Sequence, residues 1–196
     1  MGFQLPITIA EAIKKIQTQD LVLPAIQREF VWEDKQIVRL FDSVLRGYPI
    51  GSFLSWRIDP STADKFRFYG FIRDYHEKDS PHCPVLDLAA GKSVVAVLDG
   101  QQRLTALNIG LRGSFAPRLK WGWSSNPKSF PKTKLYLNVL SEASENELGM
   151  RYDFRMLREP VDKAEDGSAY WFPVRRLFEI DDIAELMEEV ATHDLG

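Results

Sequence analysis

The 196-residue sequence contains one cysteine, Cys83, so it can form no internal disulfide and offers no cysteine cluster for a metal. It has no run of 18 apolar residues, which excludes a membrane-spanning helix. The first residues lack the basic and apolar segments of a secretory signal. With 44% hydrophobic and 27% charged residues, the composition is that of an ordinary folded domain, and we expect a cytoplasmic protein.

Charge of one sign is missing from two segments. Acidic residues are absent from Gly100 to Ser141, where the basic residues are Arg103, Arg112, Arg118, Lys120, Lys128, Lys132 and Lys134. Lys and Arg are absent from Leu177 onward, where the acids are Glu179, Asp181, Asp182, Glu185, Glu188, Glu189 and Asp194. The net charge of −3 argues against a nucleic-acid surface over the whole chain. The asymmetry indicates an anionic ligand for the middle segment, and solvated basic loops explain it equally well.

Periodicity predicts a mixture of helices and strands, an α+β or α/β arrangement. Helical spacing occurs in residues 9–16, opened by a Thr8–Glu11 capping box, in residues 37–45 before Gly47, and after Gly100. Extended segments are predicted at residues 21–24, 50–58, 65–74, 94–98, 134–140 and 151–157. Loops are predicted at residues 75–92, 113–131 and 159–169. A further amphipathic helix is predicted at residues 181–190, with a stripe of Ile183, Leu186, Met187 and Val190.

The strongest candidate site follows the apolar run Val94–Leu98, where Asp99-Gly100-Gln101-Gln102-Arg103 links a buried strand to a helix. The first turn of a helix has unpaired N–H groups and partial positive charge, so it suits a phosphate. Gly100 permits a positive φ and a close approach to the backbone. The side chains expected to contact phosphate are the amides of Gln101 and Gln102, the guanidinium of Arg103 and the hydroxyl of Thr105.

Asp99 repels a phosphate, and is better suited to bind the Mg²⁺ of a nucleotide or to orient water. An Asp-Gly pair after a strand is often only a turn. A helix start with Gln-Gln-Arg and no acid favours the functional interpretation, because first turns usually carry Asp or Glu.

A second block, Gln27-Arg28, also lies between an extended segment and a helix start. The Gln27 amide and the Arg28 guanidinium are hydrogen-bond donors that provide a further place for an anion to bind. Phe30 and Trp32 follow it and could stack on a base, but packing in the core is the favoured interpretation for both.

Three blocks together carry a family resemblance: residues 21–32 (LVLPAIQREFVW), 40–51 (LFDSVLRGYPIG) and 97–107 (VLDGQQRLTAL). In this order they resemble the N-terminal domain of GmrSD-type modification-dependent restriction endonucleases. That family in turn resembles the ParB/sulfiredoxin fold, a small mixed sheet flanked by helices. The resemblance implies that residues 1–180 form a nucleotide-binding domain, and that residues 181–196 begin a helix leading to a missing C-terminal region.

The resemblance implies an NTP with Mg²⁺ as cofactor, held by Gly100 to Arg103 with Gln27 and Arg28 contributing. Asp99 and Arg103 are the expected catalytic residues of NTP hydrolysis, and Asp99 the expected metal ligand. Cleavage in such systems is assigned to a separate C-terminal nuclease domain, and some members sense modified DNA. The three histidines, His76, His82 and His193, are scattered, and neither they nor Cys83 predict a metal site.

Two alternatives remain open. One is a DNA-binding sensor without catalysis, in which the basic segment with Arg118, Lys120, Trp121 and Trp123 contacts phosphates and an extruded base. Packing of both tryptophans against the core is slightly favoured over that role. The other is a phosphotransferase, which needs an acceptor pocket that the sequence does not indicate.

Overall fold

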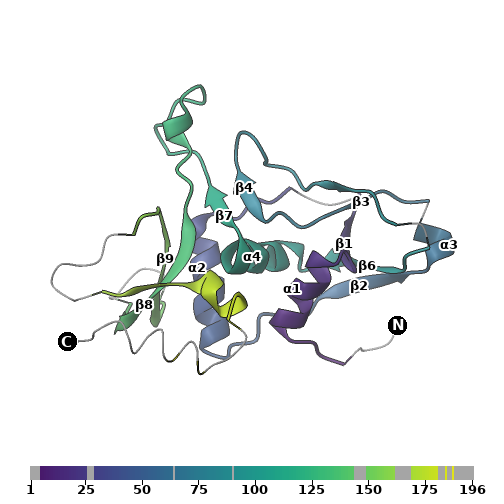
Figure 1. The fold of residues 1–196 in the computed structure, drawn as a ribbon, viewed down its shortest axis with the longest axis horizontal. Helices are drawn as coiled ribbons and strands as arrows, with labels where there is room; N and C mark the ends of the chain where they lie inside the picture. The colour runs from purple at the N-terminus through teal and green to yellow at the C-terminus, as the bar shows by residue number, and fades with distance from the viewer. Residues whose placement is uncertain are drawn as a thin grey trace.

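The computed structural model describes residues 5–25, 29–63, 65–89, 91–143, 149–161 and 169–180, together with Ala184 and Met187. The architecture is α+β, as predicted, with sheets of five, three and two strands. Helix α4 (Gln101–Arg112) runs lengthwise through the middle, with the five-stranded sheet on one side and the three-stranded sheet on the other (Figure 1). Within these described ranges, no helix is long and apolar enough to cross a membrane.

The five-stranded sheet has the order β2-β6-β1-β3-β5. Its strands are β1 (Leu21–Pro24), β2 (Leu54–Ile58), β3 (Phe68–Tyr69), β5 (Val85–Leu86) and β6 (Val94–Asp99). Strands β1 and β6 pair in parallel and the other pairs are antiparallel. The chain segments that follow β1 and β6 therefore leave the sheet at the same edge, where ligands bind in sheets of parallel strands.

Successive side chains of β1 pack into two different cores. Leu21 and Leu23 join the main core beside the helices, whereas Val22 joins a small core that includes Ala63 of α3 (Pro60–Ala63). Successive residues of a strand point to opposite faces, so both faces of this sheet are partly covered.

Three helices build the main core. α1 (Ile9–Gln17) begins at Thr8 with the predicted capping box, and α2 (Asp34–Leu45) ends just before Gly47. α4 is buried at every position from Leu104 to Leu111. Gly110 permits this packing, because a Cβ there would lie 2.5 Å from the Phe41 ring of α2. The buried Asn108 donates to the Ile72 carbonyl oxygen at 2.9 Å, so α4 has no unpaired side-chain amide donor there.

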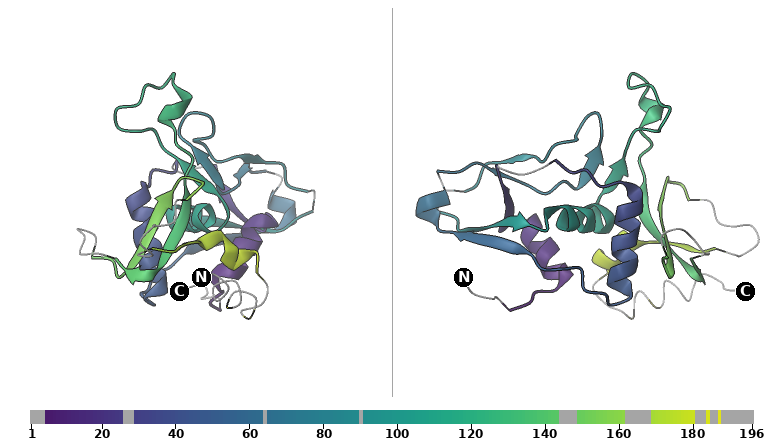
Figure 2. Two further views of the ribbon diagram at one scale, coloured as in Figure 1. Left: turned by 60° about the vertical axis from the view of Figure 1, so that its left-hand side comes forward. Right: turned by 180° about the vertical axis from the view of Figure 1, so that it is seen from behind.

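The second half of the chain forms the three-stranded sheet β10-β8-β9, with β8 (Lys134–Glu142), β9 (Tyr152–Leu157) and β10 (Trp171–Pro173). Helix η2 (Val174–Phe178) follows β10 and packs on α4. Strands β4 (Asp74–His76) and β7 (Ser114–Ala116) form a parallel pair. Between β7 and β8 the chain extends away from the body as an arm, residues 117–132, which contains η1 (Pro127–Ser129) (Figures 1 and 2).

Several predicted elements need correction. The segment predicted as a strand from residue 50 pairs only from Leu54, and its Leu54 and Trp56 side chains are exposed. The strand predicted at residues 65–74 is split at Gly70 into β3 and β4, which belong to different sheets. The elements β5, β7 and η1 lie within segments predicted to be loops, and β10 was not predicted. Each of these four elements is only two or three residues long. The helix predicted at residues 181–190 lies outside the described residues except for Ala184 and Met187.

Asp42 connects α2 to β9. Its buried carboxylate accepts hydrogen bonds from the backbone N–H groups of Arg151 and Tyr152, both at 2.9 Å, and from the Arg46 guanidinium at 3.2 Å. We expect Asp42→Ala to lower the free energy of unfolding by about 3 kcal/mol, because it leaves donors unpaired at the helix–sheet contact. Urea unfolding measures this loss. The neighbouring Ser43→Ala is the control and should change stability by less than about 0.5 kcal/mol; equal losses in the two variants would contradict the assignment.

Candidate functional site

The predicted phosphate turn lies where β6 meets α4. Gly100 is the N-cap of α4 with φ of 89°, a left-handed conformation that favours glycine. Leu104 makes the first hydrogen bond of the helix, from its N–H to the Gly100 carbonyl oxygen at 3.1 Å. The first turn contains no acid and Gly100 has no side chain to cap it. The N–H groups of the first turn and the positive end of the helix dipole therefore lie at the edge where β1 and β6 end.

Arg103 attaches a second loop to this turn. Its guanidinium donates to the carbonyl oxygens of Ile50 and Ser52, the latter at 2.9 Å, and lies 4.8 Å from the centre of the Phe53 ring. These partners belong to residues 48–53 between α2 and β2, which we call the strap. The strap carries no charged side chain, so it binds the guanidinium through neutral groups and supplies no counter-charge.

Asp99 is the acid that faces this charge. Its carboxylate lies 3.8 Å from the Arg103 guanidinium, and 73% of its side chain is exposed, compared with 21% for Arg103. A loose ion pair with an exposed carboxylate contributes little stability, so a ligand that breaks it costs the fold little.

The strap covers the turn in this structure. Gly100 is buried, and a Cβ at that position would overlap the Phe53 ring. Gly51, with φ of 83°, brings the strap backbone close to Arg103, since a Cβ there would lie 2.5 Å from the Nη1 atom. The space beside Gly100 in which a phosphate was expected to approach the backbone is therefore occupied by the strap.

The other residues predicted for this site have partners within the chain. The Gln101 amide donates to the carbonyl oxygen of Leu98 at 3.0 Å. The Gln102 amide donates to the Glu29 carbonyl oxygen at 2.8 Å and accepts from the Val31 N–H at 3.1 Å. Thr105 is 3% exposed and faces the core. These side chains hold the turn in place, so any contact with a phosphate would require them to leave these partners.

Gln27 and Arg28 lie outside the described residues. Gln102, however, binds Glu29 and Val31, just after them, and Ala25 directly follows β1. The two ends of this short segment therefore lie at the same sheet edge as Asp99 to Arg103. Phe30 packs in the core, as predicted, with its ring 5.7 Å from that of Tyr75.

A comparison with models of protein families matches residues 9–189 to the family described as the GmrSD restriction endonuclease, N-terminal domain. The chain belongs to this family. An uncharacterised protein of Methanocaldococcus jannaschii is 34% identical to it over 122 residues, which is 62% of this chain. The match spans 19% of that relative, so this chain corresponds to about a fifth of its length.

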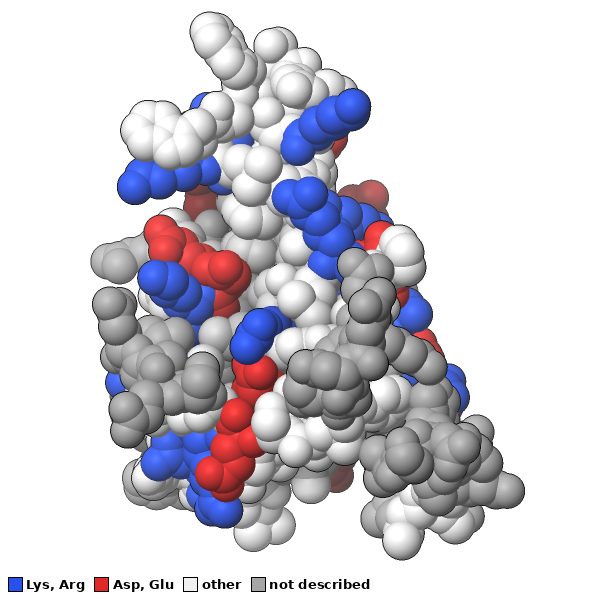
Figure 3. All heavy atoms as spheres, turned by 90° about the vertical axis from the view of Figure 1, so that its left-hand side faces the viewer, with Lys and Arg blue, Asp and Glu red and all other residues white. Residues whose placement is uncertain are grey.

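In this GmrSD-type domain the arm presents its tryptophans to solvent. Trp121 is 88% exposed and Trp123 is 79% exposed, so the favoured prediction that they pack on the core is wrong. Lys120 lies over the Trp121 ring at 5.7 Å, and the Arg118 side chain is 3.6 Å from Glu77. Figure 3 shows the arm at the top of the molecule, with basic side chains beside uncharged surface.

The arm has a defined base and fold of its own. Phe115 and Thr133 pair through two backbone hydrogen bonds of 2.9 Å, and Leu119 N–H bonds to the Ser129 carbonyl oxygen at 2.8 Å. The Phe130 ring stacks on His76 at 5.0 Å. The exposed tryptophans are therefore carried on a structured element.

Two histidines of this GmrSD-type domain take part in separate contacts, and His193 lies outside the described residues. His76 Nδ1 accepts from the Asp79 N–H at 3.1 Å, and His82 Nδ1 lies 2.9 Å from Glu29. Cys83 is partly buried, and burial raises the pKa of its thiol. Across the part of the chain that the structure describes, no three or more of His, Cys, Asp and Glu are grouped to hold a metal.

Sequence reasoning missed the strap. Its signal was present in Gly47-Tyr48-Pro49-Ile50-Gly51, a block with two glycines that both adopt positive φ. The strap covers Arg103, more than 50 residues later in the chain, because β2 pairs with β6.

Gly51→Ala and Gly47→Ala form a matched pair for testing the strap. Both substitutions place alanine at a left-handed φ, which is unfavourable by about 1 kcal/mol. A Cβ at Gly47, unlike one at Gly51, meets nothing within 4 Å. Gly51→Ala also displaces the Arg103 guanidinium from Ile50 and Ser52. We therefore expect it to lower the free energy of unfolding by roughly 1–2 kcal/mol more than Gly47→Ala. Thermal unfolding monitored by circular dichroism measures the difference, and equal losses would show that Arg103 does not secure the strap.

Proposed function

We propose that this domain binds the phosphates of a nucleoside triphosphate at the Asp99–Arg103 turn and hydrolyses it, as a regulatory part of a restriction endonuclease. One observation carries the proposal: the Arg103 guanidinium lies at the start of a helix without acids, where neutral carbonyl groups and a loose ion pair with the exposed Asp99 carboxylate are its described partners. The helix dipole and a guanidinium then both act on one anion. As negative charge develops in phosphoryl transfer, the same groups stabilise it.

Asp99 suits the Mg²⁺ that accompanies a nucleotide. Its carboxylate is exposed at the end of β6, beside the turn, and Mg²⁺ prefers oxygen ligands from one or two carboxylates together with phosphates. The bound ion would supply neutralisation of phosphate charge. Asp99 itself is placed to hold the ion or to orient the attacking water. Gln27 and Arg28 are proposed to contribute from the adjoining chain.

Binding on this turn requires the strap to move. The Phe53 ring covers Gly100, and the strap carbonyl oxygens occupy the Arg103 donors, so a phosphate must replace both. A charged phosphate is a stronger acceptor for a guanidinium than a neutral carbonyl group, which favours the exchange.

Asp99→Asn tests the catalytic role with little disturbance to the fold, because its carboxylate is exposed and its ion pair with Arg103 is loose. With the full chain, Mg²⁺ and each of the four NTPs, we expect phosphate release to fall by at least about a hundred-fold. Affinity measured by isothermal titration should fall far less than turnover. Asp87→Asn, an exposed acid beside β5, is the control. Wild-type turnover in Asp99→Asn would contradict the role of Asp99.

Arg103→Ala is expected to abolish both binding and turnover. Because it also frees the strap, Gly51→Ala serves as the control that disturbs the strap while keeping the guanidinium. Unchanged turnover in both Asp99→Asn and Arg103→Ala, with folding verified by circular dichroism, would overturn the proposed hydrolase.

The exposed arm favours a second function, contact with DNA. The matching family is one of restriction endonucleases, whose substrate is DNA. Two solvent-exposed tryptophans beside Arg118, Lys120 and Lys128, on an element without acids, suit phosphate contacts combined with base stacking. The arm could thus sense DNA while the turn uses the nucleotide.

Trp121→Ala and Trp123→Ala test this function. Stacking is worth about 1–3 kcal/mol per base, so we expect each to weaken binding of single-stranded or mismatched DNA by roughly ten-fold. Trp56→Ala, a half-exposed tryptophan on β2, is the matched control. Lys120→Ala should reduce the dependence of the affinity on salt concentration, as measured by fluorescence anisotropy. Equal affinity in the arm variants and the control would exclude the arm from DNA binding.

A further inference from the structure

The strap is bound by two arginines, one towards each of its ends. Arg103 binds the end near the phosphate turn, through the carbonyl oxygens of Ile50 and Ser52. At the other end, Arg46 Nη2 donates to the Tyr48 hydroxyl at 2.8 Å, and the guanidinium carbon lies 4.5 Å from the centre of the Tyr48 ring. The strap is therefore held by a second contact that does not involve the groups of the turn.

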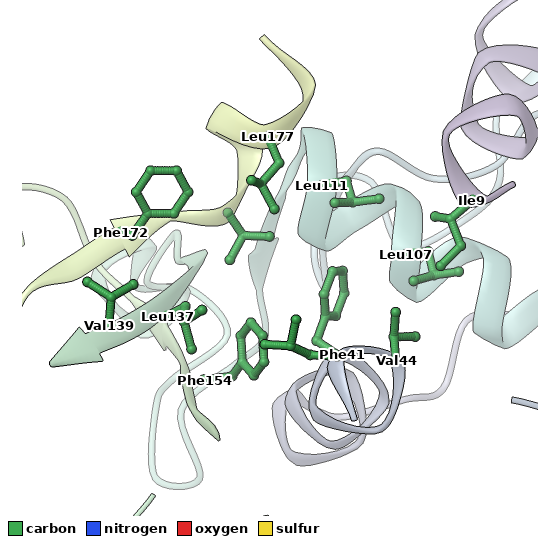
Figure 4. Close-up of a pocket in the computed structure, with 12 residues that line it drawn as sticks. Ile9, Phe41, Val44, Leu107, Leu111, Leu137, Val139, Phe154, Phe172 and Leu177 are labelled. Carbon is green, nitrogen blue, oxygen red and sulfur yellow. The ribbon is translucent and has the colours of Figure 1, made fainter. Parts of the chain in front are cut away.

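Arg46 is itself held by the body of the domain. Its Nη1 atom donates to the buried Asp42 carboxylate at 3.2 Å and to the Gly149 carbonyl oxygen at 3.1 Å. The last turn of α2, just before Arg46, lines an apolar groove between the helices, η2 and the three-stranded sheet, where Val44 lies near Leu107 of α4 (Figure 4). Arg46 thus belongs to the packed end of α2, and the strap is the part that is free to leave it.

The backbone of the strap is suited to move as a short unit. Gly47 and Gly51 have φ of 72° and 83°, and glycines of this kind accept the dihedral changes of a hinge. Residues 48–50 lie between them, and the ring of Pro49 fixes its φ. A displacement of this segment from one arginine therefore also moves it relative to the other.

We propose that the strap is an autoinhibitory element, and that the Arg46–Tyr48 contact controls how readily a nucleotide reaches the Asp99–Arg103 turn. This inference rests on the nucleotide binding proposed for that turn. The strap and a phosphate compete for the same guanidinium donors, so a nucleotide binds the fraction of molecules in which the strap is displaced. The apparent dissociation constant is the intrinsic constant divided by that fraction. Every contact that holds the strap in place therefore weakens nucleotide binding, including the contact made away from the turn.

Tyr48→Ala in the full chain tests this inference by a gain of affinity. The Tyr48 side chain is 52% exposed, and its removal leaves every group of the turn in place. With Mg²⁺ and each of the four NTPs, we expect isothermal titration to show binding at least about three-fold tighter than in wild type. Tyr48→Phe, which loses the hydroxyl and keeps the ring over Arg46, should show a smaller gain. Phe66→Ala is the control, because Phe66 is 48% exposed and lies outside the strap, and it should bind as wild type does.

The outcomes separate this inference from the proposed nucleotide site. Damage to the fold lowers affinity, so it cannot produce the expected gain. Affinity in Tyr48→Ala equal to or below that of wild type would overturn the autoinhibitory role and leave the nucleotide site intact. If none of the four NTPs binds to either protein, the proposed nucleotide site fails and the autoinhibitory role fails with it.

Hydrogen exchange measures the displacement of the strap itself. In the closed strap the Tyr48 N–H donates to the Ser43 carbonyl oxygen at 2.9 Å, and rotation at Gly47 breaks this bond. We expect a saturating NTP with Mg²⁺ to make residues 47–53 of the wild-type chain exchange faster, whereas a ligand that bound on the closed strap would slow their exchange. Residues 134–142 of β8 are the control and should exchange at an unchanged rate. Unchanged or slower exchange in the strap would overturn the inference.

Discussion

The burial of α4 on all sides is the constraint on which the rest of the structure depends. A helix buried from Leu104 to Leu111 needs apolar partners in every direction, and α1, α2, β7, β8 and η2 supply them. Gly110 lets Phe41 approach, and the Asn108 amide is paired with the Ile72 carbonyl oxygen. Because its body is held so firmly, the first turn of α4 has a fixed position at the edge of the five-stranded sheet. Precise placement of a first turn is what a phosphate site requires.

The same helix connects the two proposed functional features of the domain to the core. Asp99, Gly100 and Arg103 lie at its N-terminal turn. Its C-terminal end leads directly through β7 into the exposed arm. A nucleotide on the turn and DNA on the arm would thus act at opposite ends of one rigid element. The strap adds a competitor for the turn, since the Ile50 and Ser52 carbonyl oxygens hold the guanidinium that a phosphate would use. Exchange of these partners would move a loop that follows Arg46, whose guanidinium pairs with Asp42 beside β9.

Much of the candidate site could be predicted because its signals are local. The strand-to-helix turn, the left-handed Gly100 and the absence of acids in the first turn are all properties of a few consecutive residues. The roles of Gln102 and Thr105 could not be predicted in this way. The Glu29 partner of Gln102 and the burial of Thr105 are set by how β1 and β6 pair and by the direction in which α4 packs. The tryptophans of the arm were misjudged for a related reason: large aromatic residues are usually buried, and only the tertiary fold shows that this segment leaves the body.

The sequence by itself determined the long elements of this protein, the α+β class, the chemistry of the turn and the family resemblance. Helix caps, apolar periodicity and motif order depend on neighbours within a few residues, so they are legible without a structure. The tertiary structure decided what covers what: the strap over Gly100, the division of residues 65–76 between two sheets, the solvent exposure of the arm and the apolar groove beside η2. These features arise from contacts between residues far apart in the chain. Their free energies depend on packing and desolvation, which no local pattern encodes.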